Sequence, residues 1–316
     1  MSLRISCSPH LKTKLTIPAI MFQVILALIP AIIASILFFG IQAVFIILNC
    51  ILTSVITETI ILKVRKKPLL IKDFSAILTG LLLALILPSG TKWYAATLGS
   101  IFAILVGKHI FGGLGANIFN PALIGRAFLM AAYPKMLTTF QLPKSFSNIA
   151  VNSVDALSAA TPLSLRKFSQ TITPTIDLFF GNIPGSIGET SAVCLILGGG
   201  YLIIRKIADW RIAGSLLATT AIISSIGYFL NPLNGSMLFH LFSGGLLLGA
   251  LFMATDPVTT PITRIGRYIF GISAAIMIMV IRYFSGLPEG VMYSILFMNA
   301  ITPLINRYTR PKRFGI

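Results

Sequence analysis

Long apolar runs fill almost the whole 316-residue chain, separated by short polar or glycine- and proline-containing stretches. A bilayer-spanning helix needs roughly 20 apolar residues, because each residue of an α-helix advances about 1.5 Å. The pattern predicts ten spans, and all should be helical because a lipid-exposed backbone must satisfy its own hydrogen bonds. We expect these spans near residues 18–39, 41–62, 72–88, 93–110, 114–133, 187–204, 212–230, 237–254, 268–285 and 289–306.

One long polar stretch divides the chain into a first repeat (1–133), a loop (134–186) and a second repeat (187–316). The segment Gly80–Pro88 in the third span resembles Gly245–Met253 in the eighth. With five spans per half, the second copy would cross the membrane in the opposite direction. The expected fold class is therefore an all-α polytopic membrane protein of ten transmembrane helices, built as two inverted five-helix repeats. Such repeats place functional features near the midplane, at the seam between the halves.

Composition and charge agree with a membrane protein. Hydrophobic residues make up 56% of the chain, charged residues only 10%, and the mean hydropathy is +0.91, whereas a soluble domain is roughly 25% charged. The net charge of +17 reflects topology: eighteen of the 25 Lys and Arg residues fall in segments on the N-terminal side of the membrane, and six fall on the other side. The positive-inside rule then predicts that both termini are cytoplasmic and that the loop 134–186 lies on the opposite side of the membrane. We expect contact with the lipid bilayer and no nucleic-acid partner.

Two segments are expected to interrupt helices. Residues 111–121 hold three glycines, two asparagines and a proline, and residues 253–261 hold Asp256 together with two prolines. The freed backbone groups must meet protein, water or a ligand. Ordinary helix-end punctuation and close helix packing are the alternative interpretation. The candidate ligand-contacting residues in these segments are Gly113, Gly115, Asn117, Asn120 and Asp256.

Arg126 is the only cation that the pattern places clearly within a span. A buried arginine requires an anionic or carbonyl partner, although its long side chain could also reach toward water. The acidic residues Glu58, Asp73, Glu189 and Asp256 lie near span ends, where we expect solvated or locally paired carboxylates.

The outer loop contains a short run of small residues, Asp155–Thr161, followed by Pro162. Proline disfavours a helical conformation in the preceding residue, so Thr161 should be extended with its hydroxyl presented to the surroundings. On its own such a threonine is an ordinary loop hydroxyl. The loop lacks His and Cys between Pro134 and Ser186, which excludes a Ser–His or Cys–His hydrolase built from this loop alone.

Four segments together resemble the family that contains the D subunit of the Rnf electron-transport complex and the B subunit of the sodium-pumping NADH:quinone oxidoreductase. In that family, the threonine that ends a Ser-x-Ala-Thr motif is joined to FMN through a phosphodiester, and Ser158-Ala-Ala-Thr161 matches this motif. The segments are Gly112-Gly-Leu-Gly-Ala-Asn-Ile-Phe-Asn-Pro-Ala122, Asp155-Ala-Leu-Ser-Ala-Ala-Thr161, Thr255-Asp-Pro-Val258 and Tyr308-Thr-Arg-Pro311.

The resemblance implies a covalent FMN on Thr161, attached by a separate flavin transferase that reads Asp155 and Ser158. It implies partner subunits that carry flavins and iron–sulfur clusters, and electron transfer coupled to Na⁺ or H⁺ translocation or to reduction of a redox-sensing regulator. The wider family also holds a second, non-covalent flavin, such as riboflavin. Arg126, Gly113, Gly115, Asn117, Asn120 and Asp256 are the candidates for further flavin contacts.

Two other functions fit the same architecture. The family's membrane domain is similar to a urea channel, so a small-solute channel or transporter without flavin is the principal alternative. An inert assembly scaffold is the other. We see no catalytic acid or base and no NAD-binding fingerprint, so the chain should not oxidise NADH or ferredoxin by itself. Only the loop motif distinguishes these functions.

Overall fold

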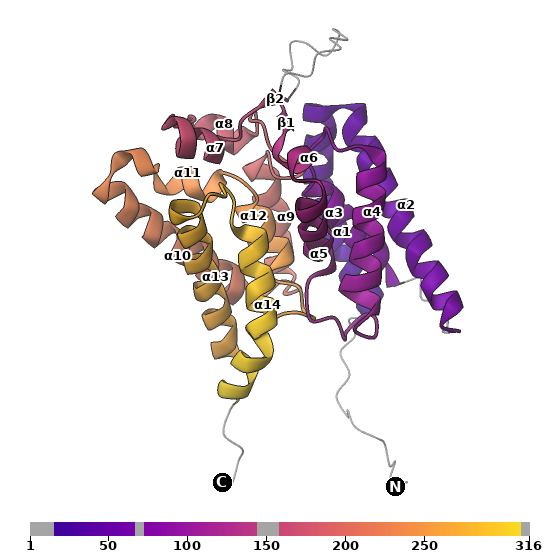
Figure 1. Cartoon of the computed structure of the whole chain (residues 1–316). Coiled ribbons are helices and arrows are strands. Elements are labelled where there is room, and N and C mark those ends of the chain that lie inside the picture. Colours follow the sequence, from indigo (N-terminus) through magenta and orange to yellow (C-terminus); the bar gives the residue numbers. More distant parts are fainter. Residues whose placement is uncertain (1–15, 67–72, 144–157, 311–316) are drawn as a thin grey trace, which may run out of the picture.

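A computed structural model describes residues 16–66, 73–143 and 158–310 as helices joined by short connections (Figure 1). The helices of the first half are α1 (Ile17–Phe39), α2 (Ile41–Val64), α3 (Ser75–Leu85), α4 (Trp93–Ile104), η2 (Leu105–His109) and α5 (Pro121–Ala132). The connecting loop contains α6 (Pro134–Thr138), β1 (Phe140–Gln141), β2 (Ser158–Ala159), α7 (Pro162–Ser164), η4 (Leu165–Ser169) and α8 (Thr175–Phe180).

The second half consists of α9 (Ala192–Ile204), α10 (Trp210–Leu230), η5 (Pro232–Asn234), α11 (Met237–Phe242), α12 (Leu246–Leu248), η6 (Gly249–Met253), α13 (Arg264–Phe284) and α14 (Val291–Tyr308). The helix α14 ends, and the chain enters α1, at the end of the molecule opposite β1 and β2 (bottom and top of Figure 1). We call these two ends the terminal end and the loop end.

A polytopic membrane protein is confirmed, but ten full-length spans are not. In the described part of the chain, α1, α2, α10 and α13 are long and apolar enough to cross a bilayer. A fifth span results if the segments Pro232–Phe242 and Leu246–Met253, which meet at 44°, count as one. The apolar helices α3, α5 and α9 have only 11 to 13 residues, fewer than the roughly 20 that a span requires.

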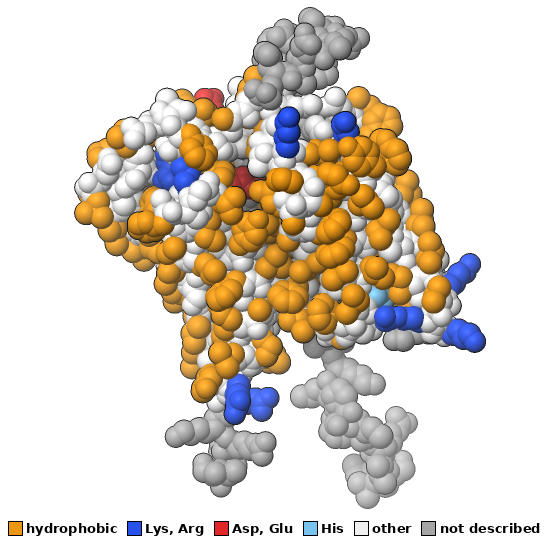
Figure 2. All heavy atoms as spheres, viewed as in Figure 1, with side chains coloured by type: hydrophobic (Ala, Val, Ile, Leu, Met, Phe, Trp, Pro, Cys, Tyr) orange, Lys and Arg blue, Asp and Glu red, His pale blue; other side chains and the backbone are white. Residues whose placement is uncertain are grey.

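The flanks of the molecule suit lipid. Large apolar side chains such as Phe45 on α2, Ile226 on α10 and Ile276 on α13 are exposed. Figure 2 shows hydrophobic side chains covering the sides, with basic side chains toward the two ends. This distribution is the one that a bilayer around the helices requires.

The short helix α3 ends against the other half of the chain. Ile187 N–H donates to the Leu87 carbonyl at 2.9 Å, and Gly188 N–H donates to the Leu85 carbonyl at 2.7 Å. These bonds satisfy carbonyls that a helix end leaves without partners. Glycine is required at 188, because a Cβ there would lie 2.6 Å from the Cβ of Leu85. The segment before α9 therefore completes the end of α3.

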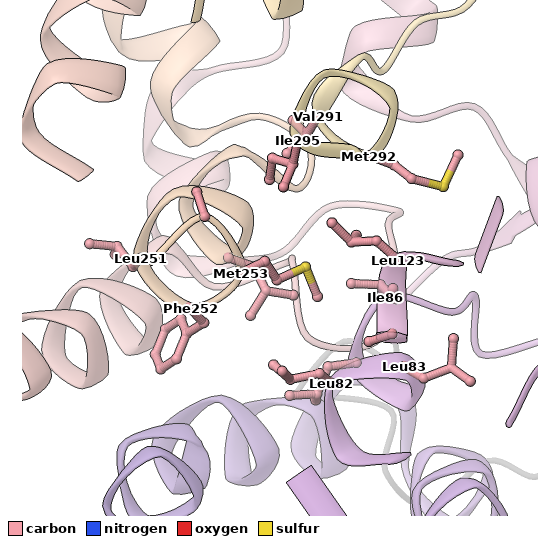
Figure 3. Close-up of a cluster of buried hydrophobic side chains, with 14 of the residues drawn as sticks. Leu82, Leu83, Ile86, Leu123, Leu251, Phe252, Met253, Val291, Met292 and Ile295 are labelled. Carbon is pink, nitrogen blue, oxygen red and sulfur yellow. The ribbon is translucent and has the colours of Figure 1, made fainter. Parts of the chain in front are cut away.

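Apolar side chains fill the seam below this junction. Helix α1 lies along α9, and α5 contacts α14. Leu82 of α3, Ile86 directly after it, Leu123 of α5, Met253 of η6 and Met292 of α14 lie around the region between the two halves (Figure 3). All five are at least nine-tenths buried, so the two halves share one hydrophobic core.

The outer loop docks on both halves. Strand β1 pairs antiparallel with β2, with Phe140 opposite Ala159. Ser89, in the turn after α3, donates from its hydroxyl to the Gln141 amide oxygen at 3.1 Å. On the other side, Leu163 is buried in a small cluster with Leu178, Ile183 and Phe239. The segment around Thr161 thus sits above the seam.

Candidate functional site

Thr161 is extended, as Pro162 predicts, with φ −65° and ψ 156°. The prediction that its hydroxyl is presented was wrong, because Thr161 is only 3% exposed. Its Oγ1 accepts from the Ser164 N–H at 3.3 Å and lies 2.9 Å from Ser164 Oγ. A threonine that precedes a helix can accept a hydrogen bond from the first free N–H groups of that helix. This capping contact turns the Thr161 hydroxyl inward.

The other motif residues precede Thr161 along the chain. Backbone pairing places Ser158 opposite Gln141 at the edge of the small sheet. Asp155 lies outside the described residues. Ala159 is half-buried and Ala160 is exposed, so the chain reaches the surface directly before Thr161.

Two basic residues fasten this segment to the ends of second-half helices. The Arg166 guanidinium donates to the Asn234 carbonyl at 2.6 Å and to the Arg282 carbonyl at 3.1 Å. Lys167 Nζ donates to the carbonyls of Arg282, Ser285 and Leu287. Cations are favoured at the C-terminus of a helix because its last carbonyls are unpaired. Burial, followed by the charge of Arg166, lowers the pKa of Lys167.

Arg126 binds two carboxylates that come from the other half. One terminal nitrogen lies 3.0 Å from Glu189 Oε1, and the other lies 3.0 Å from Glu289 Oε2. Glu189 precedes α9 and Glu289 precedes α14. The side chains are 12%, 3% and 20% exposed, respectively, for Arg126, Glu189 and Glu289. We call these three residues the seam cluster; the buried arginine has the anionic partners that its depth demands.

A cavity of about 70 Å³ near the terminal end contains three of the predicted ligand contacts, Asn117, Asn120 and Asp256. The Asn117 side-chain oxygen has no hydrogen-bond partner among the described residues. Asn120 caps α5 by accepting from the Ala122 N–H at 3.0 Å, and its amide reaches the Met253 carbonyl at 3.5 Å. Asp256 accepts from the Val258 N–H and the Thr259 hydroxyl, each at 3.3 Å.

Gly113 and Gly115 shape the chain that leads into this cavity. Their φ angles are 112° and 91°, a region that side chains other than glycine rarely adopt. A Cβ on either residue would meet no atom within 4 Å. Backbone conformation, rather than a close neighbour, accounts for these two glycines.

Lys108 borders the same cavity and forms a second buried ion pair. Its Nζ lies 2.6 Å from Glu58 Oε1 and 2.6 Å from Ser75 Oγ. The side chains of Lys108 and Glu58 are 2% and 6% exposed. The expectation of solvated carboxylates was therefore wrong for Glu58 and Glu189, because each finds a cation far away in the sequence.

The prediction of a single cation within the spans was also wrong. Arg282, which the charge count assigned to an outer segment, lies in α13 and is fully buried. It donates to the His240 carbonyl at 2.7 Å and the Ser243 carbonyl at 3.0 Å. Periodicity could not reveal this, because a residue in the last turn of a helix can equally face water.

The predicted residues therefore separate into three places. Thr161 and Ser158 lie at the loop end, Arg126 lies in the seam cluster, and Asn117, Asn120 and Asp256 meet at the opposite cavity. Sequence reasoning missed Glu289. Glu289 shares a sequence pattern with Glu189 that could have identified it. Each glutamate stands next to a glycine, Gly188 or Gly290, at the start of an apolar run in the second half.

Apolar flanks, interrupted helices and charges buried between two halves define a polytopic membrane protein with a polar seam. Comparison with known proteins then gives its family: the chain belongs to the NQR2, RnfD, RnfE family, whose model matches residues 4–315.

Three relatives are similar over nearly their full length. The D subunit of the proton-translocating ferredoxin:NAD(+) oxidoreductase complex of Clostridium ljungdahlii is 44% identical over 98% of this chain and 96% of the relative. The D subunit of the Na(+)-translocating ferredoxin:NAD(+) oxidoreductase complex of Acetobacterium woodii is 41% identical over 100% of this chain and 96% of the relative. The D subunit of the ion-translocating oxidoreductase complex of Shewanella denitrificans is 36% identical over 100% and 99%.

Proposed function

We propose that this chain is the membrane flavoprotein subunit of an Rnf-type complex and carries FMN through a phosphodiester on Thr161. It would relay electrons among flavin- and iron–sulfur-bearing subunits, between ferredoxin and NAD or toward a redox-sensing regulator, coupled to Na⁺ or H⁺ translocation. The observation that carries the proposal is the motif Ser158-Ala-Ala-Thr161 in a member of this family, whose relatives are named as subunits of ferredoxin:NAD(+) oxidoreductase complexes.

The surroundings of Thr161 suit a phosphodiester in their donor set. An ester oxygen can still accept a hydrogen bond, so the contact from the Ser164 N–H can survive. The Ser164 hydroxyl can act as the donor to the same oxygen, and the surface onto which a bulky substituent would extend is one residue away, at exposed Ala160. When bound, FMN supplies the one- and two-electron chemistry. Arg166 and Lys167 hold the segment against α13 and fix where the attached group can lie.

Burial of the hydroxyl has a consequence for maturation. A flavin transferase must reach Thr161 Oγ1, which is almost inaccessible in the docked loop. The transferase would therefore act on the loop before it docks, and it would read Asp155 and Ser158 in the undocked form.

The membrane arrangement that we propose has ten crossings in two inverted halves, a first repeat (1–133) and a second (187–316), separated by the loop 134–186. The short helices α3, α5 and α9 would cross the membrane together with the non-helical segments next to them. Irregular backbone is tolerated at that depth where protein covers it, as the Ser186–Gly188 segment covers the end of α3. Both termini would be cytoplasmic and the loop periplasmic, in a bacterial inner membrane.

A second, non-covalent flavin such as riboflavin would occupy the cavity of Asn117, Asn120 and Asp256. Amide and carboxylate groups offer the donors and acceptors that the polar edge of an isoalloxazine requires. The free space of about 70 Å³ accommodates only a few waters, so neighbouring side chains must move to admit the ring. Gly113 and Gly115 would supply the flexible approach, whereas Arg126 is engaged in the seam cluster.

In-gel fluorescence of the denatured chain, co-expressed with a flavin transferase, tests the proposal. The wild-type band should fluoresce, and mass spectrometry should find FMN on the peptide containing Thr161. Thr161→Ala should abolish the signal, whereas Thr171→Ala, which alters an exposed threonine of the same loop, should preserve it. Flavin released on denaturation would report the second site. An unmodified wild-type peptide would instead favour the small-solute channel.

A further inference from the structure

A small cavity of about 30 Å³ lies within the seam, lined by Arg126, Glu189 and Glu289 together with apolar side chains and Tyr293. This space is enough for about two water molecules or one bare cation. Figure 2 shows an acidic side chain at the bottom of a recess between the two halves, toward the loop end. In this view the acidic side chain can be seen from outside the molecule.

Glu189 is the residue of the seam cluster with unused binding capacity. Its Oε1 binds Arg126 at 3.0 Å, whereas its buried Oε2 makes no hydrogen bond of normal geometry among the described residues. The buried Ser186 side chain is a polar neighbour of the same carboxylate. The carboxylate lies against Gly245, where a Cβ would come within 2.4 Å of Oε1. Gly245 precedes the half-helix α12–η6, so the N-terminal end of that half-helix faces the carboxylate. A buried carboxylate oxygen without a partner is costly, which calls for a proton, a cation or an ordered water.

The charges near this point come from four elements. Helix α5 supplies Arg126, the segment before α9 supplies Glu189, and the segment before α14 supplies Glu289. The turn between α11 and α12 supplies only backbone and Gly244, which separates Glu289 from Arg282 of α13. The three cluster residues carry one net negative charge. Arg282 lies beyond hydrogen-bond contact with these carboxylates, so its charge weakens the site without occupying it.

We propose that this cavity binds one monovalent cation, a proton or Na⁺, at the free oxygen of Glu189. Resting on the proposed function, the site is a station for the translocated ion at the seam between the halves. An ion pathway needs binding that is favourable enough to admit the ion and weak enough to release it. Two carboxylates share the one guanidinium of Arg126, which favours a cation, and the more distant charge of Arg282 keeps that binding weak. The two relatives named for proton and Na⁺ translocation are consistent with a carboxylate that can take either ion.

Thermal unfolding of the full chain in lipid nanodiscs measures Na⁺ binding, because a ligand that binds the folded state raises the unfolding midpoint. NaCl would replace choline chloride at constant ionic strength. Infrared difference spectra between acidic and neutral pH would measure protonation through the carbonyl band of a carboxylic acid. The first variant is Glu189→Gln. The second is Glu289→Gln, which keeps the contact between Arg126 and Glu189. Asp177→Asn, in α8 of the outer loop, is the matched control.

For Na⁺, we expect a saturable rise of the midpoint in the wild type and in Asp177→Asn. Glu189→Gln should weaken the apparent affinity at least about tenfold, because it removes the charge of a buried ligand. Glu289→Gln should weaken it by a smaller factor. For a proton, Na⁺ should have no effect, and the wild type should show an acid band that is missing in Glu189→Gln. If neither response exists in wild type, or if both variants keep it, the cluster is a static ion-pair lock and the proposal is overturned. The Thr161 fluorescence of the same samples reports separately on the flavin.

Discussion

Lys108 and Arg126 are both buried cations on first-half helices, yet their surroundings differ. Lys108 binds Glu58, 50 residues away and within the same half, with a serine hydroxyl as a further acceptor. Arg126 binds two carboxylates, 63 and 163 residues away, both from the other half. The first cluster is compact and has one anion for one cation. The second crosses the seam, has an excess carboxylate and borders a cavity, which are the features of a site that binds and releases a charge.

Stability should be more sensitive to loss of a partner in the Lys108–Glu58 pair than in the seam cluster. Lys108→Met leaves the Glu58 carboxylate almost fully buried beside His109 alone, at 3.5 Å. Removing one partner of a buried pair costs about 3–5 kcal/mol, so the unfolding midpoint should fall steeply. The double variant Lys108→Met/Glu58→Leu should recover most of the loss, since neither charge remains. A single variant as stable as the wild type would contradict the pair.

Arg126→Met should cost less, about 2–4 kcal/mol, because Glu289 is partly exposed and water can reach it. Two carboxylates would then face each other without a cation. Protonation removes that repulsion, so the deficit relative to the wild type should shrink as the pH falls. Unfolding midpoints measured across a pH series test the sign. A deficit that grows toward acidic pH would mean that the carboxylates do not share this guanidinium.

Gly245→Ala should have a moderate effect, because the new methyl group would displace the Glu189 carboxylate rather than the backbone. Overpacking of this kind costs about 1–3 kcal/mol. The matched control is Gly200→Ala in α9, where a Cβ would meet no atom within 4 Å, and it should be neutral or slightly stabilising. Thermal unfolding of both variants, with and without Na⁺, would separate displacement of Glu189 from a general loss of packing.

The sequence predicted the long helices, but it predicted neither the short helices nor the partners of the buried charges. Apolar runs located α1, α2, α10 and α13 to within a few residues, because lipid-facing helices must be apolar along their whole length. The same rule overestimated α3 and α5, where apolar residues continue past the helix ends into backbone covered by the other half. Hydropathy measures burial in an apolar environment, and it does not distinguish lipid from protein.

Thr161 shows the same limit within the candidate site. Pro162 correctly predicted its extended backbone, because that effect is local. The burial of Thr161 depends on the packing of Leu163 and on two long-range contacts of Arg166. These contacts join Arg166 to Asn234 and Arg282, which lie 68 and 116 positions away in the sequence. The seam cluster likewise depends on pairings across the chain that no short window contains. The only local sequence pattern that pointed to the seam cluster is the position of Glu189 and Glu289 next to glycines before two apolar runs.

A long polar contact crosses the seam at the other end, where Asn120 both caps α5 and reaches the Met253 carbonyl at 3.5 Å. A donor–acceptor distance of 3.5 Å exceeds the usual range, so nearly all of the stability contributed by Asn120 should come from the cap. Asn120→Ala should therefore cost about 1 kcal/mol, whereas Asn120→Ser, which keeps a capping oxygen but cannot reach Met253, should cost much less. Unfolding midpoints of the two variants decide between the roles. If serine is as damaging as alanine, the crossing contact matters more than its length implies, and the seam depends on neutral hydrogen bonds as well as on the charges at Arg126.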